Sequence, residues 1–223
     1  MAALSIAQKA VSSKTTMKIW EGILFSASDN KLLLRSTDLE IGVEVTIPAE
    51  VEQSGEIVLT ATIISELIRK MSGFDIFFES DEHHQIKIEC LLSNFTLKGL
   101  SDEEFPDFPE VIEDHIFTID AAILKELIKG TLFSVATNEN IPVLTGVKIE
   151  LHDENINLIA LDGYRLALRS GKIKNPVAED LSVIIPSKSL SEINKVLASY
   201  NGDVVVKFSK NQIFFEMDNT QFT

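Results

Sequence analysis

Residues 22–40 read GILFSASDNKLLLRSTDLE, and residues 146–164 read GVKIELHDENINLIALDGY. Both stretches open with glycine, continue as a strand-like run and reach a polar turn with aspartate, at an offset of 124 residues without a gap. A second pair, 57–68 and 183–193, matches at an offset of 126, and Phe95-Thr96-Leu97 matches Phe222-Thr223 at an offset of 127. Small loop insertions explain these changes of offset. Such self-similarity indicates two copies of one domain.

The second copy shows the element order most completely. Its pattern predicts a strand at 117–119, a helix at 121–132, strands at 144–151, 155–161, 164–171 and 182–186, a helix at 187–198 with Ser187 as its N-cap, and strands at 203–208 and 211–217. The first copy predicts helices at 3–14 and 62–71. We describe each copy as a βαβββαβββ-type domain of the α+β class, with the helices on one face of curved antiparallel sheets.

An acidic connector separates the two copies. Residues 101–115 carry seven acidic side chains together with Pro106 and Pro109, and they lack both helical and strand periodicity. We therefore place the first domain at 1–100, the connector at 101–116 and the second domain at 117–223. The first copy is expected to lack its opening strand and the first turns of its first helix, and the second copy is expected to stop within its last strand.

Composition limits the possible classes of protein. With 45% hydrophobic and 24% charged residues among 223, the chain can bury substantial cores. Its apolar runs are far shorter than the roughly 20 residues that span a bilayer. A single cysteine, Cys90, cannot form an internal disulfide, which favours a reducing cytoplasm. The formal net charge of −14 argues against nucleic-acid binding unless the cations are gathered in one place.

The cations are in fact concentrated in the predicted helices. The four helical segments hold eight Lys and Arg against three acidic residues, whereas the rest of the chain holds 12 against 31. One interpretation is that Lys and Arg are good helix formers on any solvated face. The other is a phosphate-facing helix layer that binds duplex through its backbone, without sequence preference. Charge alone does not choose between them.

Three short stretches carry a resemblance to a known family. Residues 36–40 (STDLE), 104–109 (EFPDFP) and 161–167 (LDGYRLA) resemble characteristic segments of bacterial DNA sliding clamps, the beta subunit of DNA polymerase III, in the same order and at similar distances. The resemblance extends from about residue 3 to the end of the chain. It implies a non-catalytic DNA-clamp fold without cofactors, used in rings of three-domain chains that close head to tail as dimers around duplex DNA, with helices lining the hole.

The resemblance also assigns residues that face DNA. Carried over by position, or by their place on the inner helices and in the loop 137–143, they are Lys14, Arg69, Lys125, Asn138, Lys188 and Lys195. Each of these residues taken alone could equally be a solvated side chain.

The resemblance implies a second functional surface, a hydrophobic cleft that receives linear peptide motifs from polymerases and clamp-loader subunits. Its wall in the second domain matches Leu144, Leu161, Gly163, Tyr164, Arg165 and Leu166. Gly163 permits a tight turn, and tyrosine and arginine are typical of interface hot spots. The corresponding turn of the first copy, 38–40, lacks the glycine and the aromatic residue, which favours a function in the second copy alone.

A third surface joins subunits. The resemblance places an outer strand at 93–99, with Phe95 and Leu97 facing the partner subunit. Because this edge would stay open in a chain that ends at Thr223, we expect a monomer or a symmetric edge-to-edge dimer rather than a closed ring. Lys18 and Trp20 depart from the family, which usually has proline and a leucine-like residue there, so the shape of the first loop is left open.

Three alternatives were weighed against a clamp of this kind. An enzyme would need convergent reactive groups, yet Cys90 reads as core, and His83-His84 reads as a hairpin turn rather than a metal site. A trimeric ring of two-domain chains suits the chain length. A protein-interaction module without a DNA role would use the cleft alone.

Overall fold

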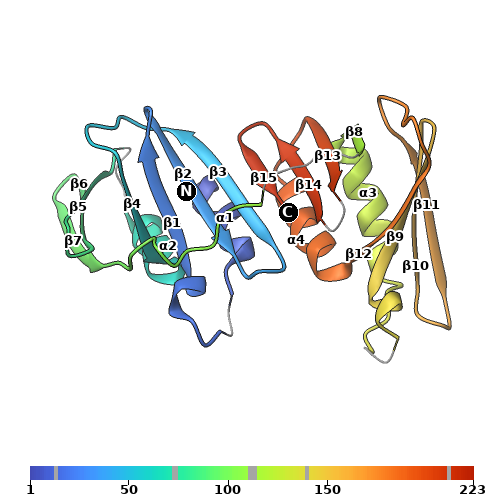
Figure 1. Ribbon diagram of the computed structural model, residues 1–223, viewed down its shortest axis with the longest axis horizontal. Helices are drawn as coiled ribbons and strands as arrows, with labels where there is room; N and C mark the ends of the chain where they lie inside the picture. The colour runs from blue at the N-terminus through green and yellow to red at the C-terminus, as the bar shows by residue number, and fades with distance from the viewer. Residues whose placement is uncertain (13–14, 72–74, 110–114, 139–140, 210–211) are drawn as a thin grey trace. The chain divides into compact units, whose positions relative to one another are not determined.

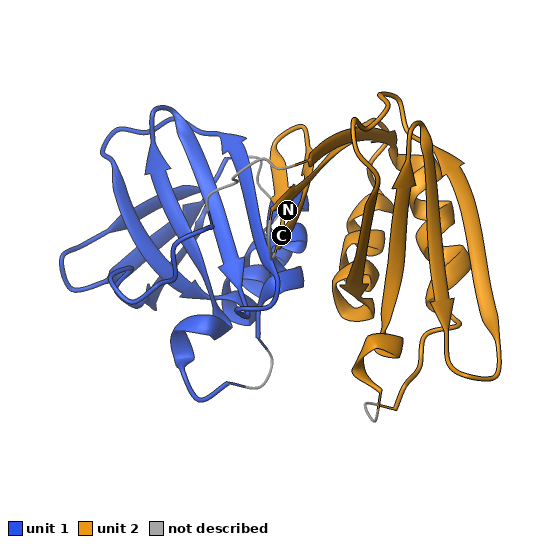
Figure 2. Ribbon diagram, turned by 45° about the vertical axis from the view of Figure 1, so that its right-hand side comes forward, with its two compact units in different colours: residues 1–109 blue, residues 110–223 orange. Residues whose placement is uncertain are grey.

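The computed structural model describes residues 1–223 except 13–14, 72–74, 110–114, 139–140 and 210–211. Figure 1 shows its helices and strands. The chain divides into two compact units, Met1–Pro109 and Glu110–Thr223, which Figure 2 shows in different colours. The division lies inside 101–116, and the part of this segment up to Pro109 belongs to unit 1.

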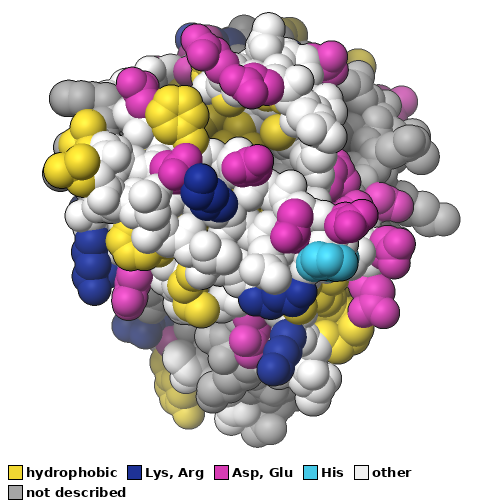
Figure 3. All heavy atoms as spheres, turned by 90° about the vertical axis from the view of Figure 1, so that its left-hand side faces the viewer, with side chains coloured by type: hydrophobic (Ala, Val, Ile, Leu, Met, Phe, Trp, Pro, Cys, Tyr) yellow, Lys and Arg dark blue, Asp and Glu magenta, His cyan; other side chains and the backbone are white. Residues whose placement is uncertain are grey.

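Unit 1 contains two antiparallel sheets. Its strands pair in the orders β4-β1-β2-β3 and β5-β6-β7. The elements are α1 (Ala2–Ala7), the 3-10 turns η1 (Gln8–Ala10) and η2 (Lys18–Glu21), β1 (Gly22–Ser28), β2 (Lys31–Thr37), β3 (Gly42–Pro48), β4 (Gly55–Thr60), α2 (Ala61–Lys70), β5 (Phe77–Ser80), β6 (Gln85–Cys90) and β7 (Ser93–Lys98). Figure 3 views the end of the unit where β5, β6 and β7 lie, and hydrophobic and acidic side chains share this face.

Unit 2 repeats this arrangement. Its strands pair in the orders β15-β14-β13-β8 and β11-β10-β9-β12, again antiparallel, and α3 packs against α4 and against strands of both sheets. The elements are β8 (His115–Asp120), α3 (Ala121–Leu132), η3 (Pro142–Thr145), β9 (Gly146–His152), β10 (Asn155–Leu161), β11 (Leu166–Lys172), β12 (Leu181–Pro186), α4 (Ser187–Leu197), β13 (Asp203–Ser209), β14 (Gln212–Met217) and β15 (Thr220–Phe222).

The repeat seen in the sequence is a repeat of structure. Strands β1, β2 and β3 begin 124 residues before β9, β10 and β11, whereas β4, α2 and β5 begin 126 residues before β12, α4 and β13. Both the α+β class and the duplication are confirmed. The predicted strands did not include β15, but they did include all four that separate α3 from α4, although the formula βαβββαβββ counts only three there. The fourth of these, β12, pairs with the side of β9 that β10 leaves open.

Close approach explains the glycine that opens each repeated stretch. A Cβ atom on Gly22 would lie 2.4 Å from Cγ1 of Val58 in β4, and one on Gly146 would lie 2.6 Å from Cγ2 of Ile184 in β12. Such separations are far inside van der Waals contact, so a side chain at either position would push the neighbouring strand away. The glycines therefore allow β1 and β9 to start directly against their neighbours.

Two predictions about helix ends were wrong. The first helix was expected over 3–14, but α1 ends at Ala7, η1 ends at Ala10 and Val11 is extended. The β-branched Val11 is a weak helix former, and the next amide, that of Ser12, donates to the carbonyl of Trp20 instead of continuing the helix. Ser187 is not the N-cap of α4 but its first helical residue. Pro186 holds the cap position, because β12 runs directly into the helix, and no side chain caps it.

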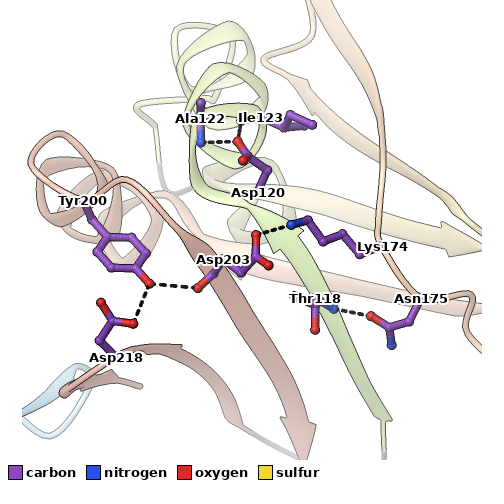
Figure 4. Close-up of polar contacts among 9 residues, drawn as sticks. All are labelled: Thr118, Asp120, Ala122, Ile123, Lys174, Asn175, Tyr200, Asp203 and Asp218. Atoms are coloured by element: carbon purple, nitrogen blue, oxygen red, sulfur yellow. Dashed lines mark hydrogen bonds and ion pairs between the residues drawn. The ribbon is translucent and has the colours of Figure 1, made fainter.

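Hydrogen bonds stabilise the edge strand β8 and the start of α3 in unit 2 (Figure 4). Asp120 caps α3, because its carboxylate accepts hydrogen bonds from the amides of Ala122 and Ile123 at 2.9 and 3.3 Å. Along β8, the amide of Thr118 donates to Oδ1 of Asn175 at 2.7 Å, and the carbonyl of Thr118 accepts from the amide of Lys174. The loop after β11 thus covers a strand edge that would otherwise present unpaired backbone groups.

The same contacts extend to the end of α4. Lys174 forms an ion pair of 2.5 Å with Asp203 at the start of β13, and the hydroxyl of Tyr200 lies 3.1 Å from the carbonyl oxygen of Asp203. Tyr200 also lies 3.2 Å from the carboxylate of Asp218. Burial, followed by the charge of Asp218, raises the pKa of the Tyr200 phenol above its usual value. This hydroxyl therefore stays protonated and able to donate.

The proline-rich segment before residue 110 is packed onto unit 1. Phe105 is buried in a cluster with Ile19, Leu24 and Val58, and the partly buried Trp20 packs against the same cluster. The departure from the family at Trp20 therefore contributes to the packing of the first loop.

Phe108 is held differently, since its ring centre lies 5.9 Å from the guanidinium carbon of Arg35, which is also bonded to Glu44. The EFPDFP stretch is thus a docked segment rather than a free linker.

Two further sequence interpretations are confirmed. Cys90 is buried at the end of β6, and the two histidines lie in the turn between β5 and β6, where the carboxylate of Asp81 accepts from the amides of His83 and Gln85 at 2.9 and 2.8 Å. The hydrogen bond from Gln85 is the largest cause that lowers the pKa of Asp81. Within the described ranges, no cluster of His, Cys, Asp and Glu is suited to a metal ion, and no helix there is long and apolar enough to cross a bilayer.

The two phenylalanines of EFPDFP give a matched pair for mutation. We expect Phe105→Ala to lower the free energy of unfolding of unit 1 by about 3 kcal/mol, because it leaves a cavity in a buried cluster. Phe108→Ala should cost less, about 1 kcal/mol, because the half-buried Phe108 packs on Arg35 rather than inside the buried cluster. Urea unfolding followed by the fluorescence of Trp20, the single tryptophan, measures both. Equal losses would contradict the different roles assigned to the two rings.

Candidate functional site

The turn between β10 and β11 holds most of the predicted cleft residues. We call residues 161–166 the β10–β11 corner. Leu161 and Leu166 face each other as the last strand pair, and Gly163 has a φ of 91° in the left-handed region that glycine tolerates best. Tyr164 at the tip is fully exposed. The structure therefore gathers Leu161, Gly163, Tyr164, Arg165 and Leu166 in one place.

A single carboxylate organises this corner. Oδ1 of Asp162 accepts hydrogen bonds from the amides of Tyr164 and Arg165 at 3.0 and 3.1 Å, and Oδ2 accepts from Nε of Arg165 at 2.9 Å. The amide of Tyr164, followed by that of Arg165, holds the pKa of Asp162 below its ordinary value of 3.8, and the Arg165 guanidinium lowers it further. Asp162 is therefore a carboxylate at neutral pH.

The guanidinium of Arg165 is held from a second side. Its central carbon lies 5.8 Å from the ring centre of Phe133, the residue that follows α3. The side chain of Arg165 is 58% exposed, whereas that of Asp162 is only 18% exposed. The arginine thus presents part of its surface to solvent while its Nε is bonded to Asp162 and its guanidinium lies near the ring of Phe133.

Leu144 lies at the same end of unit 2. It belongs to η3, and its carbonyl accepts from the amide of Ala136 at 2.9 Å. Because Ile159 of β10 faces Lys148 of β9, the start of β9 meets the end of β10 at which the corner lies. The exposed large apolar side chains in these segments are Phe133, Ile141, Val143, Tyr164 and Leu166. These side chains form an apolar surface beside the guanidinium of Arg165.

Unit 1 contains the same turn without the arginine. Oδ1 of Asp38 accepts from the amides of Glu40 and Ile41 at 3.0 and 2.8 Å, and Leu39 has a φ of 73° at the position equivalent to Gly163. At the position of Arg165 stands Ile41, which is buried. The turn is therefore a shared structural element, and the exposed tyrosine and the held arginine are particular to unit 2.

Four of the candidate DNA-facing residues lie on helices, namely Arg69, Lys125, Lys188 and Lys195. Arg69 is exposed in the last turn of α2, and its repeat equivalent is Lys195 of α4, also exposed and paired with Glu192 at 2.5 Å. Lys188 lies seven residues before Lys195, which puts the two on one stripe of α4.

The remaining candidate DNA-facing residues differ in burial and in position. Lys125 of α3 is half-buried, and Asn138 lies in the segment between α3 and η3. Lys14 lies outside the described residues.

The candidate interface residues lie on an edge strand of unit 1. Among the described strands β7 pairs with β6 and with no other, and Phe95 is 42% exposed while Leu97 is half-buried. Beside it, α2 and the β6–β7 hairpin enclose a cavity of about 510 Å³ lined by Ile63, Glu66, Leu67, Lys70, Met71, Cys90, Leu91, Leu92, Ser93 and Phe95. An open edge next to an apolar cavity is suited to receiving another polypeptide.

Sequence reasoning did not name two residues that contact Arg165, Asp162 of the corner and Phe133 after α3. An aspartate that precedes a glycine is a local turn signal, so Asp162 could have been found. Phe133 carried no such signal, because its contact with Arg165 joins segments far apart along the chain.

Comparison with known proteins gives one consistent result. The family model for the N-terminal domain of the DNA polymerase III beta subunit matches residues 1–109, and the model for its central domain matches residues 118–223. The chain is 35% identical to the beta sliding clamp of Staphylococcus epidermidis and 34% identical to that of Staphylococcus aureus, in each case over 96% of this chain and 59% of the relative.

Solved structures agree with these matches. The DNA polymerase sliding clamp from Bacillus subtilis is similar with a TM-score of 0.94 and 34% identity, and the beta subunit from DNA polymerase of Streptococcus pyogenes with 0.91 and 29%. Each similarity covers 99% of this chain and 60% of the other. The chain thus spans about three fifths of the length of the proteins it matches.

The low pKa of Asp162 gives a prediction with a definite sign. A carboxyl group whose folded pKa is depressed stabilises the native state above its unfolded pKa, near 3.8, and this contribution is lost as the pH falls through the lower folded value. NMR titration of the Asp162 carboxyl carbon should therefore give a midpoint below 3.8. Arg165→Ala should raise the midpoint only in part, because the two backbone amides still donate. A midpoint at or above 3.8 in the unchanged chain would contradict the assigned hydrogen bonds.

Proposed function

Because this chain belongs to the DNA polymerase III beta-subunit family, we propose that it is part of a DNA sliding clamp that encircles duplex DNA and keeps the polymerase on its template. The carrying observation is that the two domain models match consecutive parts of the chain, in order. The role is non-catalytic and belongs in the cytoplasm, and it needs no cofactor. The chain covers 59% of the curated relatives, so the complete ring is part of the proposal.

The helix cations support a DNA-facing role. In a chain with a formal net charge of −14, exposed cations recur at equivalent helix positions, Arg69 in α2 and Lys195 in α4. Cations on helices can contact phosphates without reading bases, which suits a protein that must move along any sequence. The acidic residues elsewhere would repel DNA from other faces. Lys14, Lys125, Asn138 and Lys188 complete the proposed contacts.

The β10–β11 corner supports a role in peptide binding. A fully exposed tyrosine, an arginine and two leucines are grouped with Leu144 at one end of unit 2. Tyrosine and arginine contribute strongly to binding, and an exposed tyrosine has no structural need at a turn tip. We propose that this surface is one wall of the site that takes linear motifs from the polymerase and clamp-loader subunits.

The open edge of β7 supports subunit contact. Phe95 and Leu97 alternate along the strand and so point to the same side, next to the cavity formed with α2. We propose that a partner subunit adds a strand at this edge and fills the cavity with apolar side chains.

A topological experiment tests the ring. The protein purified from its host should be loaded by the clamp loader onto nicked circular DNA and should stay bound during gel filtration at high salt. Linearising the circle should release it, because an encircling ring slides off a free end. An ordinary binder depends on salt whatever the topology of the DNA. Equal retention on circular and linear DNA would refute encirclement.

A peptide titration tests the second-domain wall. The chain should bind a labelled peptide from the carboxyl terminus of the host's replicative polymerase, and Tyr164→Ala should weaken this binding about tenfold or more, as expected for an aromatic hot spot. Glu40→Ala, at the position of Tyr164 in the equivalent turn of unit 1, is the matched control and should leave the affinity unchanged. Binding that is insensitive to Tyr164 would show that the peptide site lies elsewhere.

A further inference from the structure

We propose that Asp162 and Phe133 are positioning residues, which hold the Arg165 guanidinium in one orientation so that it can receive an acceptor group of the bound peptide. This inference rests on the peptide site proposed above and assigns it a mechanism. The hydrogen bond from Nε of Arg165 to Oδ2 of Asp162 and the ring of Phe133 act on the guanidinium together.

Comparison of the two units separates two roles of the aspartate. Both Asp38 and Asp162 use Oδ1 to accept two backbone amides and thereby build the turn. That role is structural, because unit 1 has it with a buried isoleucine at the position of the arginine. The bond from Oδ2 to Nε is an addition made in unit 2, where the side chain at that position is charged and 58% exposed.

The geometry leaves a defined part of the arginine for a ligand. Nε is bonded to Asp162, and the guanidinium carbon lies 5.8 Å from the centre of the Phe133 ring. The terminal nitrogens carry the remaining N–H groups of the planar fork, which suits a carboxylate or two carbonyl oxygens. A peptide with an acidic side chain, or with a carbonyl exposed beside its apolar anchor, matches this donor set.

The energetic advantage of the arrangement lies in preorganisation. An unrestrained arginine would lose rotamer freedom when the peptide binds, whereas one already fixed by an ion pair and a ring loses less. Asp162 is suited to this task because its own side chain is only 18% exposed and is fixed by two amides. A surface ion pair of this kind would add little to stability, so its effect should appear in binding.

The test uses Asp162→Asn, which can keep an acceptor oxygen for the two amides but replaces Oδ2 with an N–H donor that faces another donor. NMR titration of the 223-residue chain with the polymerase carboxyl-terminal peptide should show affinity weakened by about three- to tenfold, since the arginine must now be ordered on binding. Phe133→Leu should weaken it by a smaller factor. Asp38→Asn makes the same change in the turn of unit 1 and should leave the affinity unaltered.

A double substitution distinguishes positioning from mere support of the turn. In the background of Arg165→Ala, Asp162→Asn should have no further effect, because the two residues act as one unit. An equal loss in both backgrounds, or full affinity for Asp162→Asn, would overturn the inference while the peptide site itself stands. Absence of peptide binding by the unchanged chain would instead remove the proposed site, and the inference with it.

Discussion

Each unit depends on a close contact between two neighbouring strands at one glycine, Gly22 in unit 1 and Gly146 in unit 2. Gly22 and Gly146 have no room for a Cβ atom, because β4 and β12 lie against them. In this contact Gly22 pairs with Thr60 at the end of β4, and Gly146 pairs with Pro186 at the end of β12, directly before α2 and α4 begin. A side chain at either glycine would displace the strand that leads into α2 or α4, and with it the helix that carries Arg69 or Lys195.

The two units share one scaffold, and unit 2 carries additional chemistry on it. The turns at Asp38 and Asp162 share the same backbone hydrogen bonds, down to the left-handed residue that follows each aspartate. In unit 1 the turn ends in a buried isoleucine, which adds to the core. In unit 2 it ends in an arginine that faces solvent. Because the two turns have the same backbone hydrogen bonds, it is their side chains that distinguish the structural turn of unit 1 from the candidate binding surface of unit 2.

Outside the β10–β11 corner, two features distinguish one part of the surface from another: the distribution of charge and the open edge of β7. Cations outnumber acidic residues in α2, α3 and α4, where their long side chains extend from a rigid element, whereas acidic residues outnumber cations in the rest of the chain. The loop after β11 covers the edge of β8 with Lys174 and Asn175, whereas β7 keeps an uncovered edge with exposed Phe95. A strand edge is a site for unwanted pairing, so one that stays open beside an apolar cavity is suited to a specific partner.

The amino-acid pattern was sufficient to predict the duplication, the α+β class, the turn at each aspartate and the places of most strands and helices, because these follow from periodicity and local turn chemistry. It failed where local signals were weak, at the end of α1, where Val11 leaves the helix, and at the short strand β15, which was not predicted as a separate strand. Only the tertiary structure decided that Phe105 is buried with Trp20 while Phe108 packs on Arg35, and that Phe133 lies on Arg165. These contacts join segments distant in the chain, so they depend on how whole elements pack, which no local pattern encodes.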